Sequence, residues 1–268
     1  MKHILLVWLP LVIAYGTTLM WVVDRWNAPT LYYQHGWLVP FIAAAIIFYR
    51  RPQWLKTLAV ADRRALWLFL PGLFMHLCGA MLMIDSLSAS SLVLTVPGAA
   101  WLTLGRERLR GLWPVLFLAL FAVPSPMYIE GRVSFMLKEF AVSGGAGLAN
   151  WLGAGVTRVG ANLNIDGTSS SLYVADACGG LRSLMAMMTL GYCVAFFIGS
   201  TSAVRRVTLL LVTVPLAVTA NVVRIAALCL MGRWFGVEFA EGIGHTLANV
   251  CEWVADVSLL LLLDGVLS

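Results

Sequence analysis

Three side chains in the C-terminal half of the sequence have the types that nucleophilic chemistry needs. Cys178, Arg224 and His245 supply a thiol, a guanidinium and an imidazole. A thiolate can attack a carbonyl carbon, an imidazole can move protons, and a guanidinium can stabilise the oxyanion that develops. The sequence therefore predicts a site for covalent cysteine chemistry, provided that the fold brings the three groups together.

Cys178 differs from the other cysteines in its surroundings. It stands before a predicted helix, followed by Gly179 and Gly180, and Arg182 comes four residues later. Because a helix N-terminus and a guanidinium group both stabilise negative charge, this position favours the nucleophilic thiolate. The other cysteines, none of them in a CxxC pair, are Cys78, Cys193, Cys229 and Cys251. They lie in apolar runs, where cysteine behaves as a small hydrophobe, so we expect neither a disulfide framework nor a zinc site.

Arg224 interrupts an otherwise apolar segment and shares a helix face with Asn221, three residues earlier. One interpretation is an arginine that extends to the lipid headgroups. The other is an arginine turned into the protein, with Asn221 beside it. The residue types alone leave both interpretations open.

His245 begins a polar stripe on the last apolar segment. Asn249, Glu252 and Asp256 follow it at spacings of four, three and four residues, so all four lie on one helix face. Such a stripe must face protein or water, because lipid cannot solvate it. The stripe either orients His245 or packs the helices together.

The elements that carry these residues are predicted to be membrane helices. The chain has 268 residues, of which 60% are hydrophobic and 12% charged, against about 25% charged in soluble domains. Each span needs about 20 apolar residues. We predict an all-α polytopic membrane protein with about eight transmembrane helices. The candidate spans are Ile4–Val23, Gly36–Tyr49, Ala65–Ile84, Leu87–Leu104, Leu112–Val123, Leu181–Gly199, Val207–Met231 and Thr246–Leu263.

The segment before Cys178 is predicted to lie outside the cytoplasm. Gly131 to Gly160 indicates an amphipathic or partly re-entrant helix. Next, Asn162–Ile165 and Leu172–Val174 alternate apolar and polar residues around the turn signal Asp166-Gly167, which predicts a small β-hairpin.

The distribution of basic residues predicts the orientation. A cytoplasmic N-terminus places most of the 18 Lys and Arg residues in cytoplasmic segments, as the positive-inside rule requires. Since the net charge of +5 comes from these clusters between spans, we expect no binding to nucleic acid. The first apolar run is expected to be an uncleaved span. We predict one integral membrane domain over residues 1–268, with N-terminal spans in 1–123 and a catalytic half in 124–268.

These residues resemble the pattern of the exosortase/archaeosortase family of prokaryotic membrane cysteine transpeptidases. The family has A-C-S-G-[ILV]-R-S, then N-x-x-R in the next span and a His before the last. Ala177-Cys-Gly-Gly-Leu-Arg-Ser, Asn221-Val-Val-Arg and Gly244-His245 match in order and spacing. The stretch from Val123-Pro-Ser-Pro to Gly167 is also similar, so the resemblance covers roughly the C-terminal half. Gly179 departs from the pattern, because the family has Ser there.

The resemblance implies an enzyme of the prokaryotic cell (inner) membrane that acts at the extracytoplasmic face. Family members cleave a C-terminal sorting signal of exported proteins, made of a short motif, a transmembrane helix and a basic cluster. They transfer the new C-terminus to an acceptor, a lipid or a polysaccharide. It further implies that Cys178 is the nucleophile, His245 the general acid/base, and Arg224 the group that stabilises the oxyanion or the thiolate. Arg182, Asn221, Gly179 and Asn249 are supporting candidates.

Two other classes of function remain open at this point. In a transporter or channel, Arg224, His245, Glu252 and Asp256 would line a polar path through the bilayer. In a structural subunit, the same groups would only join helices. The sequence shows no phosphate-binding glycine loop, dinucleotide fingerprint or metal pattern, so we expect no cofactor.

Overall fold

The computed structural model describes residues 2–28, 32–55, 60–175, 178–199 and 202–267. The chain is mostly helical, as predicted, and carries one small antiparallel sheet within this described part. It divides into two compact units, Met1–Glu130 and Gly131–Ser268. The predicted single membrane domain stays a prediction.

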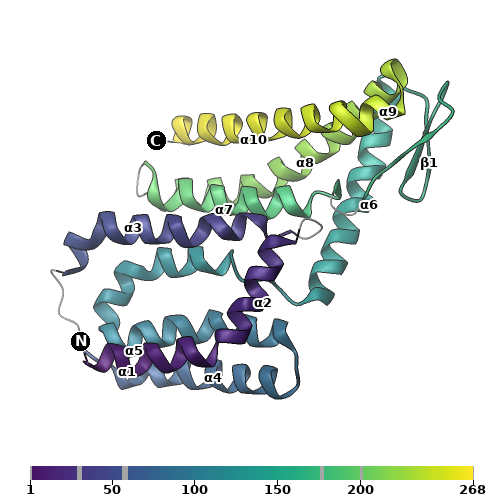
Figure 1. Cartoon of the computed structure of the whole chain (residues 1–268). Helices are drawn as coiled ribbons and strands as arrows, with labels where there is room; N and C mark the ends of the chain where they lie inside the picture. The colour runs from purple at the N-terminus through teal and green to yellow at the C-terminus, as the bar shows by residue number, and fades with distance from the viewer. Residues whose placement is uncertain (1, 29–31, 56–59, 176–177, 200–201, 268) are drawn as a thin grey trace. The chain divides into compact units, whose positions relative to one another are not determined.

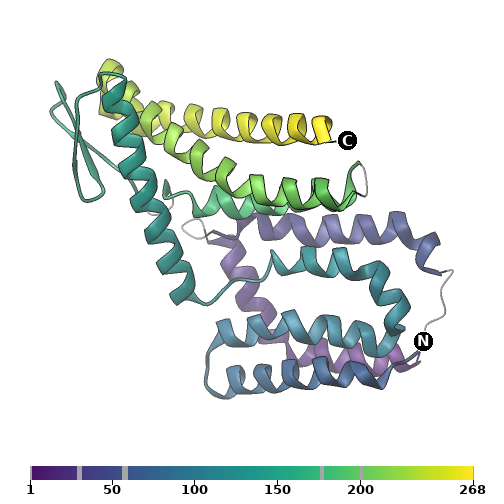
Figure 2. The same ribbon diagram turned by 180° about the vertical axis from the view of Figure 1, so that it is seen from behind.

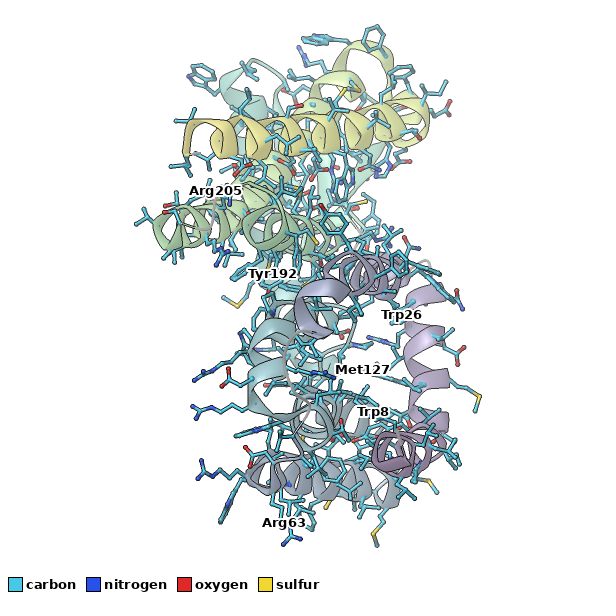
Figure 3. The ribbon with its side chains drawn as sticks, turned by 90° about the vertical axis from the view of Figure 1, so that its left-hand side faces the viewer. Trp8, Trp26, Arg63, Met127, Tyr192 and Arg205 are labelled. Atoms are coloured by element: carbon cyan, nitrogen blue, oxygen red, sulfur yellow. The ribbon has the colours of Figure 1, made fainter. Side chains whose placement is uncertain are left out.

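The first unit consists of helices that fold back on one another (Figure 1). Its elements are α1 (Lys2–Ala14), α2 (Gly16–Asn27), the short 3-10 helix η1 (Gln34–Trp37), α3 (Leu38–Leu55), the short 3-10 helix η2 (Arg63–Ala65), α4 (Leu66–Met81) and α5 (Asp85–Leu120). Arg63, at the start of η2, is exposed and extends away from the ribbon in Figure 3.

α4 and α5 form an antiparallel hairpin whose backbones approach closely. A Cβ on Gly79 would lie 2.6 Å from the backbone nitrogen of Ser88, and one on Gly98 would lie 2.8 Å from the Cα of Phe69. Small residues at a helix interface permit this distance, as is common in membrane bundles. The glycines are therefore part of the packing of this hairpin.

Buried hydroxyl groups link α1 and α2 to the α4–α5 hairpin. The Tyr15 hydroxyl lies 2.6 Å from Ser91 Oγ and 2.8 Å from Thr95 Oγ1. His76 Nδ1 lies 2.7 Å from Ser88 Oγ, and its ring stacks on that of Tyr15 at 3.8 Å. In an apolar environment each buried polar group needs such a partner.

Three helical segments are long and apolar enough to cross a bilayer, namely Arg63–Met81, Asp85–Leu120 and Ala203–Phe235. A fourth span results if Leu5–Ala14 and Gly16–Asn27, bent by 61°, are one broken crossing. Gln34–Tyr49 and Leu181–Phe197 are shorter apolar helices. The described residues therefore support three to four candidate spans by this criterion, and the larger predicted number is not confirmed.

One pair of predicted spans falls largely within the range of α5. Leu87–Leu104 and Leu112–Val123 lie on two helical segments separated by a kink at Gly105, whose backbone is non-helical, and Figures 1 and 2 show the ribbon turning back between them. This glycine has φ +81°, and a Cβ there would lie 2.2 Å from the carbonyl oxygen of Val60. The basic residues that mark a loop in the sequence therefore follow a kink inside α5.

The second unit contains most of α6 (Met127–Trp151), the strands β1 (Val156–Val159), β2 (Asn162–Ile165) and β3 (Ser171–Tyr173), and four further helical segments. These are α7 (Leu181–Phe197), α8 (Ala203–Phe235), α9 (Val237–Phe239) and α10 (His245–Leu267), with the π-turn η4 (Ala240–Gly244) before α10. Figures 1 and 2 show α7, α8 and α10 side by side, with the sheet next to α6 and α9.

The predicted two-stranded hairpin is wrong in one respect, because the sheet has three strands in the order β1-β2-β3. β2 and β3 pair as expected, with Leu163 opposite Leu172, but β1 adds the pair Val156 and Ile165. These apolar residues are buried in one core with Ile225 of α8 and Val142 of α6. β1 thus completes the apolar face that packs against the helices.

Arg205 joins the ends of α7, α8 and α10 in the second unit (Figure 3). Its side chain is 1% exposed and donates hydrogen bonds to the carbonyl oxygens of Val194, Ala195 and Ile198 at the end of α7. It also forms an ion pair with Asp264 of α10. One buried cation therefore caps α7 and connects it to the other two helices.

Candidate active site

The fold brings Cys178, Arg224 and His245 together within the second unit. Cys178 precedes α7, Arg224 lies on α8, and His245 is the first residue of α10. The Cys178 sulfur lies 3.2 Å from His245 Nε2. This is hydrogen-bond distance for a sulfur and an imidazole nitrogen, so a proton can pass between them.

Arg224 is turned into the bundle rather than towards headgroups, since only 8% of its side chain is exposed. Nη2 donates to the carbonyl oxygen of Cys178 at 2.8 Å and to Asn221 Oδ1 at 2.6 Å. Nη1 donates to Asn249 Oδ1 at 2.7 Å and lies 2.9 Å from Glu252 Oε2. The guanidinium thus contacts the backbone of Cys178, while its terminal nitrogens are also held by side chains of α8 and α10.

Asn249 connects Arg224 to His245. Its Nδ2 lies 3.4 Å from His245 Nδ1, the ring nitrogen on the far side from Cys178. Because arginine only donates hydrogen bonds, the amide oxygen of Asn249 faces Arg224 and the amide nitrogen lies towards His245. In the tautomer of His245 with its proton on Nδ1, this 3.4 Å approach is a contact and not a hydrogen bond. Asn249, a supporting candidate from the sequence, therefore contacts two of the three main residues.

Irregular backbone precedes His245. The segment from α9 to α10 passes through the π-turn η4, in which Gly242 has the non-helical angles φ −90° and ψ −107°. A π-turn inserts an extra residue into a helix and changes which residues face inward after it. His245 is the first residue after this irregular segment.

The surroundings of His245 keep its imidazole neutral. Burial, and to a lesser degree the positive charge of Arg224, lower the pKa of His245 below its ordinary value. A neutral imidazole can accept a proton from a thiol, whereas an imidazolium cannot. The residue is therefore in the form that a general base requires.

Gly180 and Asn221 fix the backbone after Cys178. Gly180 has φ +93°, and a Cβ there would lie 2.5 Å from Asn221 Nδ2. A side chain at this position would be strained and would also displace Asn221. Gly179 is buried beside it, and Arg182 is half-buried on the first turn of α7. The supporting roles of Gly179 and Arg182 stay predictions.

The partner of Arg224 was not identified from the sequence. The spacing of Asn249, Glu252 and Asp256 predicted one helix face, but it did not show that Glu252 would pair with Arg224. Asp256 is fully buried, and within the described residues neither of its carboxylate oxygens has a hydrogen-bond partner. Both carboxyl groups are buried, and what distinguishes Glu252 is its ion pair with Arg224.

The described residues contain no group of three or more His, Cys, Asp and Glu side chains that could hold a metal ion. The expectation that no cofactor is needed stays a prediction. The reactive groups that the geometry offers are the thiol and imidazole of Cys178 and His245, together with the guanidinium of Arg224.

Comparison with known proteins gives a family for this arrangement. A family model described as Transmembrane exosortase (Exosortase_EpsH) matches residues 26–263, which is most of the chain. No curated protein and no solved structure matches the chain. The family match spans the site and extends well into the first unit. The chain therefore belongs to the transmembrane exosortase family and is a multi-pass membrane protein.

Proposed function

We propose that this protein is a membrane-embedded cysteine transpeptidase or endopeptidase that cleaves the C-terminal sorting signals of exported proteins. Membership of the exosortase family implies a transpeptidase-type enzyme. The observation that carries the proposal furthest is the 3.2 Å distance between the Cys178 sulfur and His245 Nε2. A nucleophile within hydrogen-bond reach of a neutral base is the arrangement that covalent catalysis needs.

In the proposed reaction, the Cys178 sulfur attacks the carbonyl carbon of a peptide bond. His245, neutral with its proton on Nδ1, takes the thiol proton at Nε2, and an oxyanion forms. When the C–N bond breaks, the leaving amine takes this proton from Nε2, and the remaining acyl group stays on sulfur as a thioester. Water or the nucleophile of an acceptor then attacks the thioester and gives its proton to Nε2, and the proton returns to the Cys178 sulfur as the C–S bond breaks. A peptide cut at this site therefore loses the segment C-terminal to the scissile bond.

Arg224 supports this reaction through position and charge. Its hydrogen bond to the Cys178 carbonyl oxygen holds the backbone that carries the nucleophile. Its positive charge, close to His245, favours the neutral imidazole and an anion on the substrate or on sulfur. Asn221 and Asn249 keep the guanidinium in place through hydrogen bonds of 2.6 and 2.7 Å.

We place the site at the extracytoplasmic face of a prokaryotic cell (inner) membrane. The positive-inside distribution of basic residues supports this orientation. Substrates would be exported proteins whose short motif reaches the outer surface while their own transmembrane helix lies beside the enzyme. The acceptor would be a lipid or a polysaccharide.

The test is co-expression with an exported reporter protein that ends in a short motif, a transmembrane helix and a basic cluster from the same genome. We expect Cys178→Ala to abolish cleavage of the tail while the enzyme stays in the membrane at normal amounts. Cys193→Ala, which removes a half-buried thiol of α7, is the matched control and should cleave normally. Normal cleavage by Cys178→Ala would rule out the proposal and favour a structural subunit.

A further inference from the structure

Glu252 is a buried anion whose contact with the site is through Arg224 rather than through Cys178 or His245. Its side chain is 2% exposed, and Oε2 lies 2.9 Å from Arg224 Nη1. A charged guanidinium that is buried without a counterion costs several kcal/mol. Glu252 therefore supplies the counterion of the buried Arg224 guanidinium.

The hydrogen bonds of Arg224 show what this ion pair controls. Each terminal nitrogen meets two oxygen atoms, and one of the four belongs to the backbone of Cys178. Within the described residues, Nε has no hydrogen-bond partner. Because the four contacts fix the plane of the guanidinium, a change at Glu252 moves the group that holds Cys178. The effect would then extend to the contact between the Cys178 sulfur and His245.

Asp256, one helical turn further along α10, provides the contrast. It is fully buried and, unlike Glu252, has no ion pair with Arg224 among the residues that the structure describes. An ionised carboxylate in such surroundings is destabilised, which favours the neutral acid. The site thus contains one guanidinium and two carboxyl groups, of which only Glu252 balances its charge.

We propose that Glu252 is a positioning residue of the Cys178 site, which neutralises and aims Arg224. This proposal rests on the proposed cysteine chemistry, in which Cys178 and His245 react together. It assigns Glu252 neither contact with substrate nor a place on a transport path. Charged and titratable groups around His245 are Cys178 before α7, Arg224 on α8 and, through Arg224, Glu252 on its own helix.

The first test measures alkylation of Cys178 as a function of pH, in a background where the other four cysteines are replaced by alanine. The probe is a small maleimide, so no substrate is needed. Glu252→Gln keeps an oxygen that can accept from Arg224 but removes the negative charge. Since Arg224 would then act on the thiol and imidazole without compensation, we expect the pH midpoint of alkylation to fall by on the order of one unit.

Asp256→Asn is the matched control, because it alters a buried carboxyl group on the same helix that does not balance Arg224. We expect its alkylation midpoint to equal that of the parent protein. Glu252→Asp retains the charge on a shorter side chain and should also keep the parent midpoint. A shared shift in Glu252→Gln and Asp256→Asn, or no shift in Glu252→Gln, would overturn the proposal.

The second test measures cleavage of the tailed reporter. We expect Glu252→Gln to cleave roughly 10- to 100-fold more slowly, the range for losing an interaction with a charged group. Asp256→Asn should stay within about twofold of the parent protein. If Glu252→Gln inserts poorly into the membrane, Glu252→Asp serves as the test. It should keep the alkylation midpoint of the parent protein and cleave the reporter more slowly. A shifted alkylation midpoint in Glu252→Asp would contradict the proposal. If the alkylation midpoints are as predicted but the parent protein does not cleave the reporter, the proposed function is refuted and the positioning role of Glu252 is not.

Discussion

The ion pair between Arg205 and Asp264 offers a test of the three-helix arrangement that needs no substrate. In Asp264→Leu, Arg205 would stay buried among α7, α8 and α10 without its counterion. Removing one partner of a buried pair costs about 3–5 kcal/mol. We expect about 3 kcal/mol, at the lower end of that range, because Arg205 keeps its hydrogen bonds to three carbonyl oxygens of α7.

The assay is thermal unfolding of the purified protein in detergent, followed with a maleimide dye that becomes fluorescent on reaction with thiols. Cys229 is fully buried and reports unfolding as it becomes reactive. For a chain of this size, 1 kcal/mol corresponds to about 2–4 °C, so the midpoint should fall by about 6–12 °C. The double variant Arg205→Met/Asp264→Leu removes both charges and should recover much of this loss. Equal midpoints for the single and double variants would refute the reasoning.

Three further predictions concern the site itself. Cys178→Ser should lose cleavage of the tailed reporter almost completely while keeping the same unfolding midpoint, because hydroxyl is a much weaker nucleophile than thiolate. Burial and Arg224 lower the pKa of His245. The cleavage rate should therefore persist below a pH of about 6.5 and fall only where the imidazole becomes protonated. Arg224→Gln removes a positive charge beside the ring, so the fall in its residual cleavage rate should begin at higher pH. Gly180→Ala places a Cβ 2.5 Å from Asn221 Nδ2 at a backbone φ of +93° and should lower stability by at least about 1–2 kcal/mol. Gly147→Ala, whose Cβ would meet nothing within 4 Å, should be neutral in the same unfolding assay.

The periodicity of the helices explains why much of the site could be predicted. Asn221 and Arg224 are three residues apart and share one helix face, as their spacing required, and the structure shows that this face is buried. The same argument placed His245, Asn249 and Glu252 on one face of α10. Helical spacing determines which residues share a face, so these groupings needed no structure.

Contacts between elements could not be predicted in the same way. Glu252 pairs with Arg224 because α8 and α10 are rotated so that their polar faces meet. That rotation depends on side-chain packing and on the turn at η4, neither of which has a periodic signal. β1 was missed for a related reason. Val156–Val159 follows a glycine-rich apolar stretch that resembles helix, and only its pairing with β2 makes it a strand.

The π-turn at Ala240–Gly244 leads directly into α10 and affects the direction in which the side chains of α10 point around the helix axis. Successive residues of a helix are separated by about 100° around its axis. Deleting one residue within this turn would convert it to regular helix and rotate the downstream polar stripe by about that angle. The spacing within the stripe would be unchanged, yet the imidazole and the carboxylate would both turn away from their partners. A short irregular turn thus determines whether an intact set of side chains forms one site.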